Sequence, residues 1–233
     1  MPPPVLGILM LETRFPRPPG DVGNPATWPF PVRMATVPSA TADRIVRAGT
    51  PDPALLDPFV AVAHGLIAAG ARCLTTSCGF LAPYQAALTA RLPVPVLTSA
   101  LMQVPWVAAT LPAGRRVGVV TVDAGRLGPA HLAAAGAPAD TPVAGVEGGR
   151  ELHRVLLGDG TALDTAAAAE DMRDAVARLL DRHPDVGAVV LECTNMPPYA
   201  PMLRRTFGLP VHDVVTAVRW LVAGVVGKAA ENP

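Results

Sequence analysis

The sequence predicts an α/β protein with two pseudo-symmetric lobes, each a mostly parallel sheet flanked by helices, and a cleft between the lobes. Three observations support this fold class. Short apolar runs alternate with amphipathic stretches along the chain. Several of these runs are apolar almost throughout, as in strands that are covered on both faces. The second half of the chain also repeats the pattern of the first.

Eight short apolar runs are interpreted as strands on this basis. The predicted strands cover residues 5–11, 32–37, 72–76, 95–98, 116–122, 143–146, 187–192 and 210–212. A helix is predicted over residues 52–70, where apolar side chains recur on one side and a glycine ends the pattern. Another is predicted over residues 161–183, an Ala-rich stretch with acidic residues early and basic residues late, as the helix dipole favours.

The repeat is clearest around two cysteines. When Cys78 is placed on Cys193, a proline and a tyrosine that follow each of them coincide without a gap. A second match joins residues 5–12 to residues 116–123. Internal repeats decide an architecture, so two related lobes are expected, each with one matched cysteine. The predicted lobes are residues 1–98 together with 213–233, and residues 99–212.

Composition excludes several classes of protein. Of 233 residues, 50% are apolar and 16% charged, which predicts a compact globular chain rather than a disordered one. The 19 basic and 19 acidic residues balance, so nucleic acid is not an expected partner. The apolar stretch 214–227 contains Arg219 and is shorter than the roughly 20 residues of a membrane span. It predicts a buried or interface helix, no membrane partner, and a possible homodimer.

The cysteines and the N-terminus favour the cytoplasm. The first residues, MPPPVLG, show no charged region followed by an apolar core, so no signal peptide is expected. Three cysteines do not make a disulfide framework, and unpaired thiols persist in a reducing compartment. No HExxH, CxxC, GxSxG or nucleotide-binding glycine motif is present, so neither metal nor cofactor is expected. A zinc site from Cys78, Cys193 and His212 is a weaker alternative.

The two matched cysteines are the predicted catalytic residues. Each follows a buried strand and precedes a helix, which places both at the carboxyl ends of parallel strands, where open α/β sheets bind ligands. Helix N-termini there hold anions such as carboxylates, and their field lowers the pKa of a thiol. Across one cleft, the thiolate of Cys78 or Cys193 can remove a proton from carbon while the other thiol returns one on the opposite face.

A lone cysteine at a strand end is more often a small buried hydrophobe, and the repeat is what favours a function here. Cys73 lacks a counterpart, since Ala188 stands at the matching position, and it is interpreted as part of the core. Glu192 precedes Cys193 and is expected to point to the opposite face of its strand, as a structural carboxylate.

Residues beside the cysteines and on the Pro-rich loop 12–31 are the predicted substrate contacts. These are Ser77, Gly79, Phe80, Thr194, Asn195, Thr13 and Asn24. Long loops of this kind are uncommon and often functional. Arg14 and Arg17 on the loop could clamp a distal carboxylate, but solvated arginines are the favoured interpretation. Asp21 is interpreted as an ordinary turn residue.

The paired strand–Cys–helix units resemble those of the aspartate/glutamate racemase superfamily, whose members carry one catalytic cysteine per lobe. Cys193-Thr194 matches the Cys-Thr of that family, where the threonine helps to hold the substrate carboxylate. The first motif, Cys78-Gly79-Phe80, departs from the usual Cys-Asn-Thr. The resemblance extends to hydantoin racemase, maleate isomerase and arylmalonate decarboxylase. The last of these keeps only the second-half cysteine, whereas this chain has both.

The predicted function is that of a cofactor-independent racemase or epimerase, an isomerase that inverts a carbon next to the carboxylate of an amino acid or related small acid. Cys78 and Cys193 are its acid and base. The alternatives are cis–trans isomerisation or decarboxylation of a small dicarboxylate on the same fold, and a non-catalytic small-molecule binding protein. A reversible disulfide between the two cysteines is a further alternative.

Overall fold

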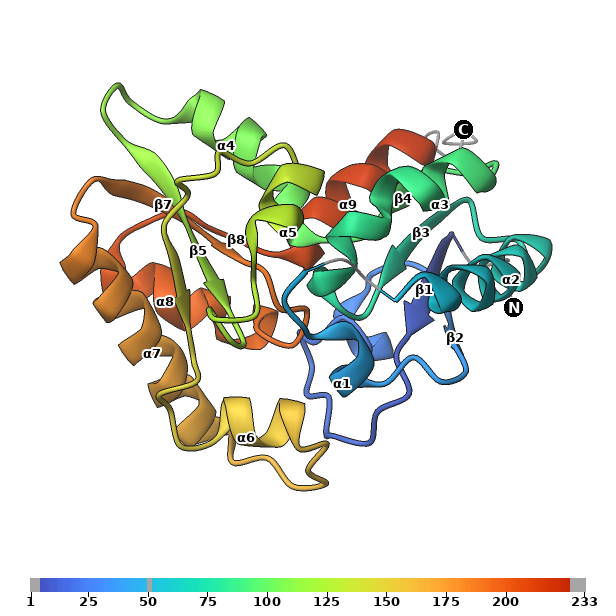
Figure 1. Cartoon of the computed structure of the whole chain (residues 1–233), viewed down its shortest axis with the longest axis horizontal. Coiled ribbons are helices and arrows are strands. Elements are labelled where there is room, and N and C mark those ends of the chain that lie inside the picture. The colour runs from blue at the N-terminus through green and yellow to red at the C-terminus, as the bar shows by residue number, and fades with distance from the viewer. Residues whose placement is uncertain (1–4, 50–51, 227–233) are drawn as a thin grey trace, which may run out of the picture.

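A computed structural model describes residues 5–49 and 52–226 and contains two four-stranded parallel sheets (Figure 1). The first sheet has the order β2-β1-β3-β4 and the second the order β6-β5-β7-β8. The strands of the two sheets are β1 (Leu6–Met10), β2 (Val32–Thr36), β3 (Cys73–Thr76), β4 (Val96–Leu97), β5 (Arg116–Thr121), β6 (Val143–Gly145), β7 (Val186–Leu191) and β8 (Val211–His212). The two orders are equivalent, which confirms the fold class and the repeat, and each predicted strand is present within one residue of its expected bounds.

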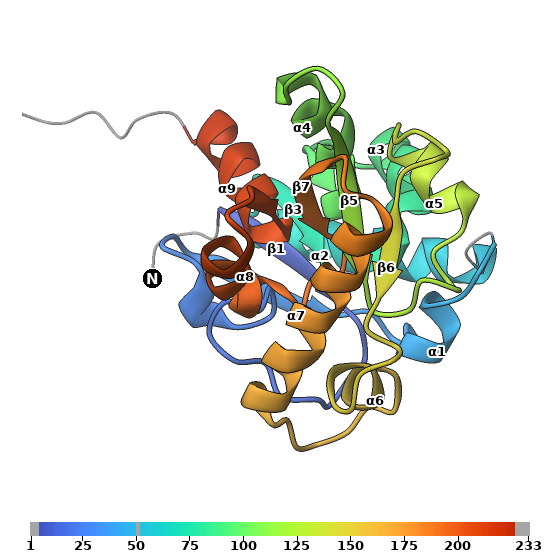
Figure 2. The same ribbon diagram turned by 90° about the vertical axis from the view of Figure 1, so that its left-hand side faces the viewer.

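Helices cover the faces of both sheets, as expected for parallel strands joined by crossovers. The α-helices are α1 (Ala42–Ile45), α2 (Leu56–Ala68), α3 (Gln85–Arg91), α4 (Val104–Thr110), α5 (Pro129–Ala134), α6 (Leu152–Leu157), α7 (Thr165–Arg182), α8 (Ala200–Phe207) and α9 (Val214–Val225). Short 3-10 helices are η1 (Pro25–Thr27), η2 (Pro53–Leu55), η3 (Gly79–Tyr84), η4 (Ala100–Gln103) and η5 (Pro197–Tyr199). Figure 2 shows α7 lying along β5 and β6, with which it makes contact.

Matched glycines bring a helix close to the central strand of each sheet. A Cβ on Gly7 of β1 would lie 2.5 Å from a methyl carbon of Leu74 and 3.1 Å from Leu66 of α2. A Cβ on Gly118 of β5 would lie 2.7 Å from a methyl carbon of Leu179 in α7. Real Cβ contacts are not this short, so glycine at both positions permits the same close packing of helix on sheet.

Segments cross between the lobes at two points. After β4 the chain continues into η4 and α4, which contact β7 and β5 of the second sheet. After β8 it returns in α9, which contacts β3 and β4 of the first sheet. Gln103 of η4 joins these segments, because its side-chain N–H group donates to the Asp213 carbonyl over 2.9 Å while its side-chain oxygen accepts from Thr216 over 3.0 Å. The division at 98/99 and 212/213 stays a prediction.

The wall of the second lobe near the cleft depends on a buried acid. Asp171 of α7 accepts hydrogen bonds from the backbone N–H groups of residues 150, 151 and 152 at 2.8, 2.8 and 2.7 Å, and so holds the start of α6. A Cβ on Gly149 would lie 2.3 Å from this carboxyl carbon, so the approach requires glycine. Helix α6 in turn contacts α1 of the first lobe (Figure 1).

Within the described residues, no helix is long and apolar enough to cross a membrane. The C-terminal helix α9 instead leaves Trp220 59% exposed beside Trp106 of α4, with ring centroids 4.5 Å apart. The homodimer stays a prediction. The N-terminal residues 1–4, on which part of the signal-peptide expectation rests, and residues 227–233 lie outside the described residues.

Candidate functional site

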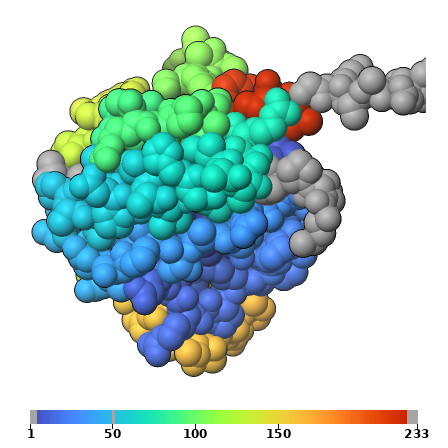
Figure 3. Space-filling view, turned by 90° about the vertical axis from the view of Figure 1, so that its right-hand side faces the viewer, coloured from blue at the N-terminus to red at the C-terminus, as the bar shows by residue number. Residues whose placement is uncertain are grey.

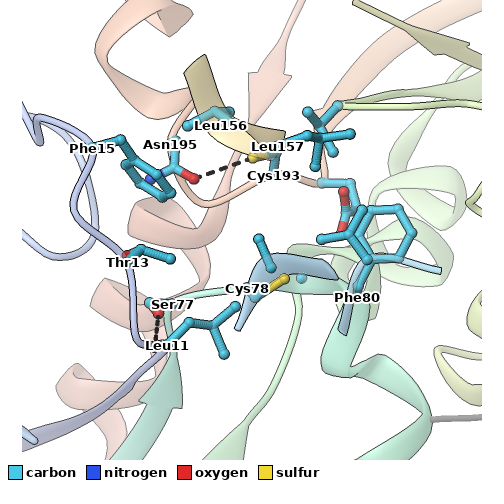
Figure 4. A pocket seen from close by; sticks show the side chains of 15 residues that line it. Leu11, Thr13, Phe15, Ser77, Cys78, Phe80, Leu156, Leu157, Cys193 and Asn195 are labelled. Atoms are coloured by element: carbon cyan, nitrogen blue, oxygen red, sulfur yellow. Dashed lines mark hydrogen bonds between the residues drawn. The ribbon is translucent and has the colours of Figure 1, made fainter. Parts of the chain in front are cut away.

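The two matched cysteines line one cavity between the lobes (Figure 4). Cys78 follows β3 and precedes η3, and Cys193 follows β7. Most of the cavity wall is apolar. Its lining residues are Leu11, Thr13, Phe15, Ala42, Val46, Ser77, Cys78, Gly79, Phe80, Val122, Leu156, Leu157, Glu192, Cys193 and Asn195. The free volume is about 30 Å³, enough for one or two water molecules, so a substrate must widen the cavity to enter.

Both cavity thiols are protonated at neutral pH in this closed arrangement. Burial raises the pKa of Cys78, and the charge of Glu192 raises it further, against a hydrogen bond from the Phe80 N–H and the charge of Arg17. Burial likewise raises the pKa of Cys193 well above its usual value, with Glu192 adding to it and the Asn195 N–H opposing it. The expected lowering of the thiol pKa was therefore wrong, because burial outweighs the backbone donors.

A chain of hydrogen bonds connects Cys193 to the long loop. The Cys193 Sγ donates to Asn195 Oδ1 over 3.5 Å, and the Asn195 amide donates to Asp21 Oδ2 over 2.6 Å. Arg17 then donates from Nη1 to Asp21 Oδ1 over 2.9 Å and from Nη2 to Thr13 Oγ1 over 3.0 Å. Asp21 is buried, at 1% exposure, although its Oδ1 also accepts from the Gly23 N–H as an ordinary turn residue does. The Arg17 side chain is only 12% exposed, so the expectation of a solvated arginine was wrong at this position.

The loop 12–31 belongs to the first lobe and closes against the second. Arg14 forms an ion pair with Asp159, which lies just after α6, over 2.9 Å. Gly20 (φ +100°) lies against Pro198, and the Val22 N–H donates to the Thr194 carbonyl over 3.3 Å. On the surface in Figure 3, the blue residues of the loop lie beside the gold segment around α6. The loop therefore forms one side of the cavity through Thr13 and Phe15.

Most of the predicted substrate contacts lie together, and two do not. Thr13, Ser77, Gly79, Phe80 and Asn195 line the cavity with the cysteines. The other two predicted contacts, Thr194 and Asn24, lie outside it.

These two residues use their polar groups within the protein. Thr194 is fully buried, and its hydroxyl donates to the Ser77 carbonyl over 2.6 Å. Asn24 accepts from the Ala26 N–H at the start of η1 over 2.9 Å and donates to the Arg17 carbonyl over 2.7 Å. Both hold loops that support the cavity, rather than contributing to its wall.

Glu192 lines the cavity, contrary to the expectation that it points away. Strand β7 ends at Leu191, so the alternation of side chains along a strand does not extend to residue 192. Its Oε2 accepts from the Thr121 hydroxyl over 2.7 Å. Burial raises the pKa of Glu192 to about 7, although the Thr121 hydrogen bond acts in the other direction. The one signal in the sequence for this placement was Gly79, because the absence of a side chain there leaves room for the Glu192 carboxyl group.

A family profile described as Asp/Glu/Hydantoin racemase matches residues 30–222. The chain belongs to this family. Similar curated proteins are named as lyases. The chain is 26% identical to "Dimethylsulfoniopropionate lyase" from Durusdinium sp. clade D, over 98% of this chain and 76% of that protein. It is 30% identical to "Dimethylsulfoniopropionate lyase 5" from Emiliania huxleyi (strain CCMP1516), over 99% of this chain but only 46% of that protein.

Solved structures of the racemase family have the same fold. An arylmalonate decarboxylase superposes with a TM-score of 0.61 at 19% identity, over 96% of this chain and 94% of that one. The allantoin racemase of Klebsiella pneumoniae gives 0.59 at 20%, over 94% and 86% of the two chains. A glutamate racemase of Bacillus anthracis gives 0.54 at 14%, over 97% and 84%. These relatives are enzymes, but they include racemases, a decarboxylase and lyases, so the family alone does not establish an isomerase.

Proposed function

We propose that this family member is a cofactor-independent lyase that removes the proton next to the carboxylate of a small acid and expels a group from the neighbouring carbon. The preferred substrate is dimethylsulfoniopropionate or a similar β-substituted propionate. The observation that carries the proposal is the placement of Cys78 and Cys193 on one buried cavity. The similarity to dimethylsulfoniopropionate lyases, which extends over nearly all of this chain but over 76% and 46% of the two relatives, supports elimination as the reaction.

The chemistry requires one proton transfer and one bond cleavage. A cavity thiolate takes the α-proton, and the electron pair moves into the carboxylate, which becomes an enediolate. The pair then returns to form the carbon–carbon double bond while the carbon–sulfur bond breaks. Dimethyl sulfide leaves with the sulfur electrons, acrylate remains, and the thiol releases its proton to solvent. The N–H groups of Phe80 and Asn195 stabilise the thiolate form of Cys78 and Cys193 respectively.

The wall of the cavity suits a small, partly apolar acid. Leu11, Phe15, Val46 and Leu156 supply much of its surface and match the methyl groups of dimethyl sulfide. Among the described residues that line it, no Arg, Lys or His is present to bind a second carboxylate. Glutamate and aspartate, which need such a partner, are therefore not the proposed substrates.

Racemisation or epimerisation is the second candidate, and one observation favours it. Cys78 and Cys193 come from different lobes and lie on different sides of the cavity (Figure 4). A substrate carbon between them could lose a proton to one thiolate and gain one from the other thiol, with inversion. Decarboxylation on the same fold would differ by releasing carbon dioxide.

One substrate screen in deuterium oxide separates these reactions. The purified protein is given dimethylsulfoniopropionate, amino acids, hydantoins and dicarboxylates, and four products are followed: dimethyl sulfide, carbon dioxide, deuterium on the α-carbon and optical rotation. The proposal predicts dimethyl sulfide and acrylate in equal amounts. Deuterium incorporation with inversion of an amino acid or hydantoin, and no dimethyl sulfide, would replace elimination by racemisation.

A further inference from the structure

Glu192 lines the cavity, and one oxygen of its carboxyl group is buried without a partner among the described residues. The residue is 0% exposed, and the Thr121 hydroxyl satisfies only Oε2. Oε1 has no hydrogen-bond partner among the residues that the structure describes. A buried polar atom left unpaired is costly, and such atoms in folded proteins call for a functional explanation.

The carboxyl group of Glu192 fills the place that a side chain at position 79 would take. A Cβ built on Gly79 would lie 2.3 Å from Glu192 Oε1 and 2.9 Å from its carboxyl carbon. Gly79 directly follows Cys78, and Glu192 directly precedes Cys193. One acid group from the second lobe therefore stands beside the first-lobe cysteine motif, where the sequence lacks a polar side chain.

The charges around Glu192 favour its neutral form. Glu192 acts on the two cavity thiols, Cys78 and Cys193, and no charged group acts on Glu192 itself. The other charges that act on these thiols are Arg17 on Cys78 and Asp21 on Cys193. Arg17 is engaged by Asp21 at 2.9 Å. Burial lowers the pKa of His131, which packs against Phe80 with ring centroids 5.0 Å apart and stays uncharged. No free cation among the described neighbours stabilises a Glu192 carboxylate.

We propose that Glu192 binds substrate as a neutral acid, donating a hydrogen bond from Oε1 to the substrate carboxylate. The inference rests on the proposed function in that the substrate must carry a carboxylate. Because Thr121 donates to Oε2, the acid proton on Oε1 is free to point into the cavity. The donor strengthens its bond as the carboxylate becomes an enediolate, which lowers the barrier to α-proton removal.

The neutral form also assists the cysteines. An ionised Glu192 raises the pKa of both Cys78 and Cys193, so it opposes formation of the thiolate base. A protonated Glu192 removes that repulsion and adds a donor for the substrate. If Glu192 acted instead as a base, or as a partner for a cationic group, it would have to be ionised. The two roles give opposite results in Glu192→Gln, which keeps a hydrogen-bond donor but cannot ionise.

The test is calorimetric binding of propionate, which has the carboxylate but no leaving group. Wild type should bind it about tenfold more weakly at about pH 8 than at about pH 6, because Glu192 ionises between them. Glu192→Gln keeps the donor and should bind equally at both pH values. Glu192→Ala should bind weakly at both. Glu147→Gln, an exposed acid of the second lobe, is the matched control and should behave as wild type.

Infrared spectra of the same samples should show a protonated carboxyl band at about pH 6 that is lost at about pH 8 and is absent from Glu192→Gln. Wild-type binding that does not change with pH would overturn the inference, as would Glu192→Gln binding as weakly as Glu192→Ala. If Glu192→Ala fails to fold, the wild type and Glu192→Gln still decide it.

The two proposals fail separately. Dimethyl sulfide release together with pH-independent propionate binding would overturn the role of Glu192 and keep the lyase. Propionate binding whose pH dependence is lost in Glu192→Gln, without turnover in the substrate screen, would overturn the lyase and keep the role of Glu192. Absence of propionate binding to wild type at about pH 6 would overturn the role of Glu192 directly.

Discussion

Replacing Asp21 with alanine tests whether a buried carboxylate, paired with Arg17 within the long loop, fastens that loop to Asn195 of the second lobe. The Asp21 carboxylate accepts from Arg17 over 2.9 Å, from the Gly23 N–H over 2.7 Å and from Asn195 over 2.6 Å. Asp21→Ala removes the acceptor of all three hydrogen bonds at a position that is 1% exposed. Arg17 and Asn195 then keep buried donors that have lost their acceptor.

The expected loss of stability is about 4 kcal/mol. Breaking a buried ion pair by removing one partner costs about 3–5 kcal/mol, and the lower end applies because the Arg17 side chain retains 12% exposure. The unpaired Asn195 amide adds about 1 kcal/mol. For a chain of this size each kcal/mol lowers the melting temperature by about 2–4 °C, so a fall of about 8–16 °C is expected.

Guanidinium unfolding followed by circular dichroism measures this loss, and Arg14→Ala is the matched control. Arg14 lies on the same loop and also pairs with the second lobe, but its side chain is 74% exposed. Exposed ion pairs contribute at most about 1 kcal/mol, so the control should be nearly as stable as wild type. A loss below about 1 kcal/mol for Asp21→Ala, or equal losses in both variants, would refute the reasoning.

Three further predictions concern the cavity wall. Gly79→Ala should destabilise the protein by about 2 kcal/mol or more and displace the acid beside it, because the new Cβ would meet the Glu192 backbone oxygen at 2.3 Å. Circular dichroism melting measures this, and an unchanged melting temperature would contradict it. Asp171→Ala should lose about 2–4 kcal/mol because three N–H groups at the start of α6 lose their acceptor, whereas the exposed Asp174→Ala should change little in the same unfolding assay. Stability should fall as the pH rises from 4.5 to about 7, because Glu192 binds its proton more tightly when folded than when unfolded. This contribution reaches about 3 kcal/mol and should vanish in Glu192→Gln, as unfolding at several pH values would show.

The fold could be predicted from the sequence because its main signals are local or repeated. Each strand is a short apolar run. In β7 the run is unbroken, because the strand is buried on both faces. The repeat around Cys78 and Cys193 then placed both cysteines at equivalent strand ends, and parallel sheets bring such ends to the same edge. Cys78 and Cys193 follow strands of different sheets, and they share a cavity because the two lobes face each other.

Other features depend on contacts between distant residues and left no local pattern. Asp21 and Asn195 lie on different lobes, and nothing near either indicates that their side chains meet. Local composition therefore predicted the turn at Asp21 but neither its burial nor its partner. The protonation of the thiols likewise depends on how completely the lobes close, and a helix terminus by itself predicts the wrong direction.

The claim on which the proposed function depends most is that the thiolate of Cys78 or Cys193 is the base that removes the α-proton of the substrate. The measurement is the rate of α-proton removal, as dimethyl sulfide release or deuterium incorporation, in Cys78→Ser, Cys193→Ser and Cys73→Ser. Cys73 is also buried but is not among the cavity-lining residues. We predict a loss on the order of a hundredfold or more in the cavity variant that lacks the base, and a rate near wild type for Cys73→Ser. Full activity in both cavity variants would contradict the account.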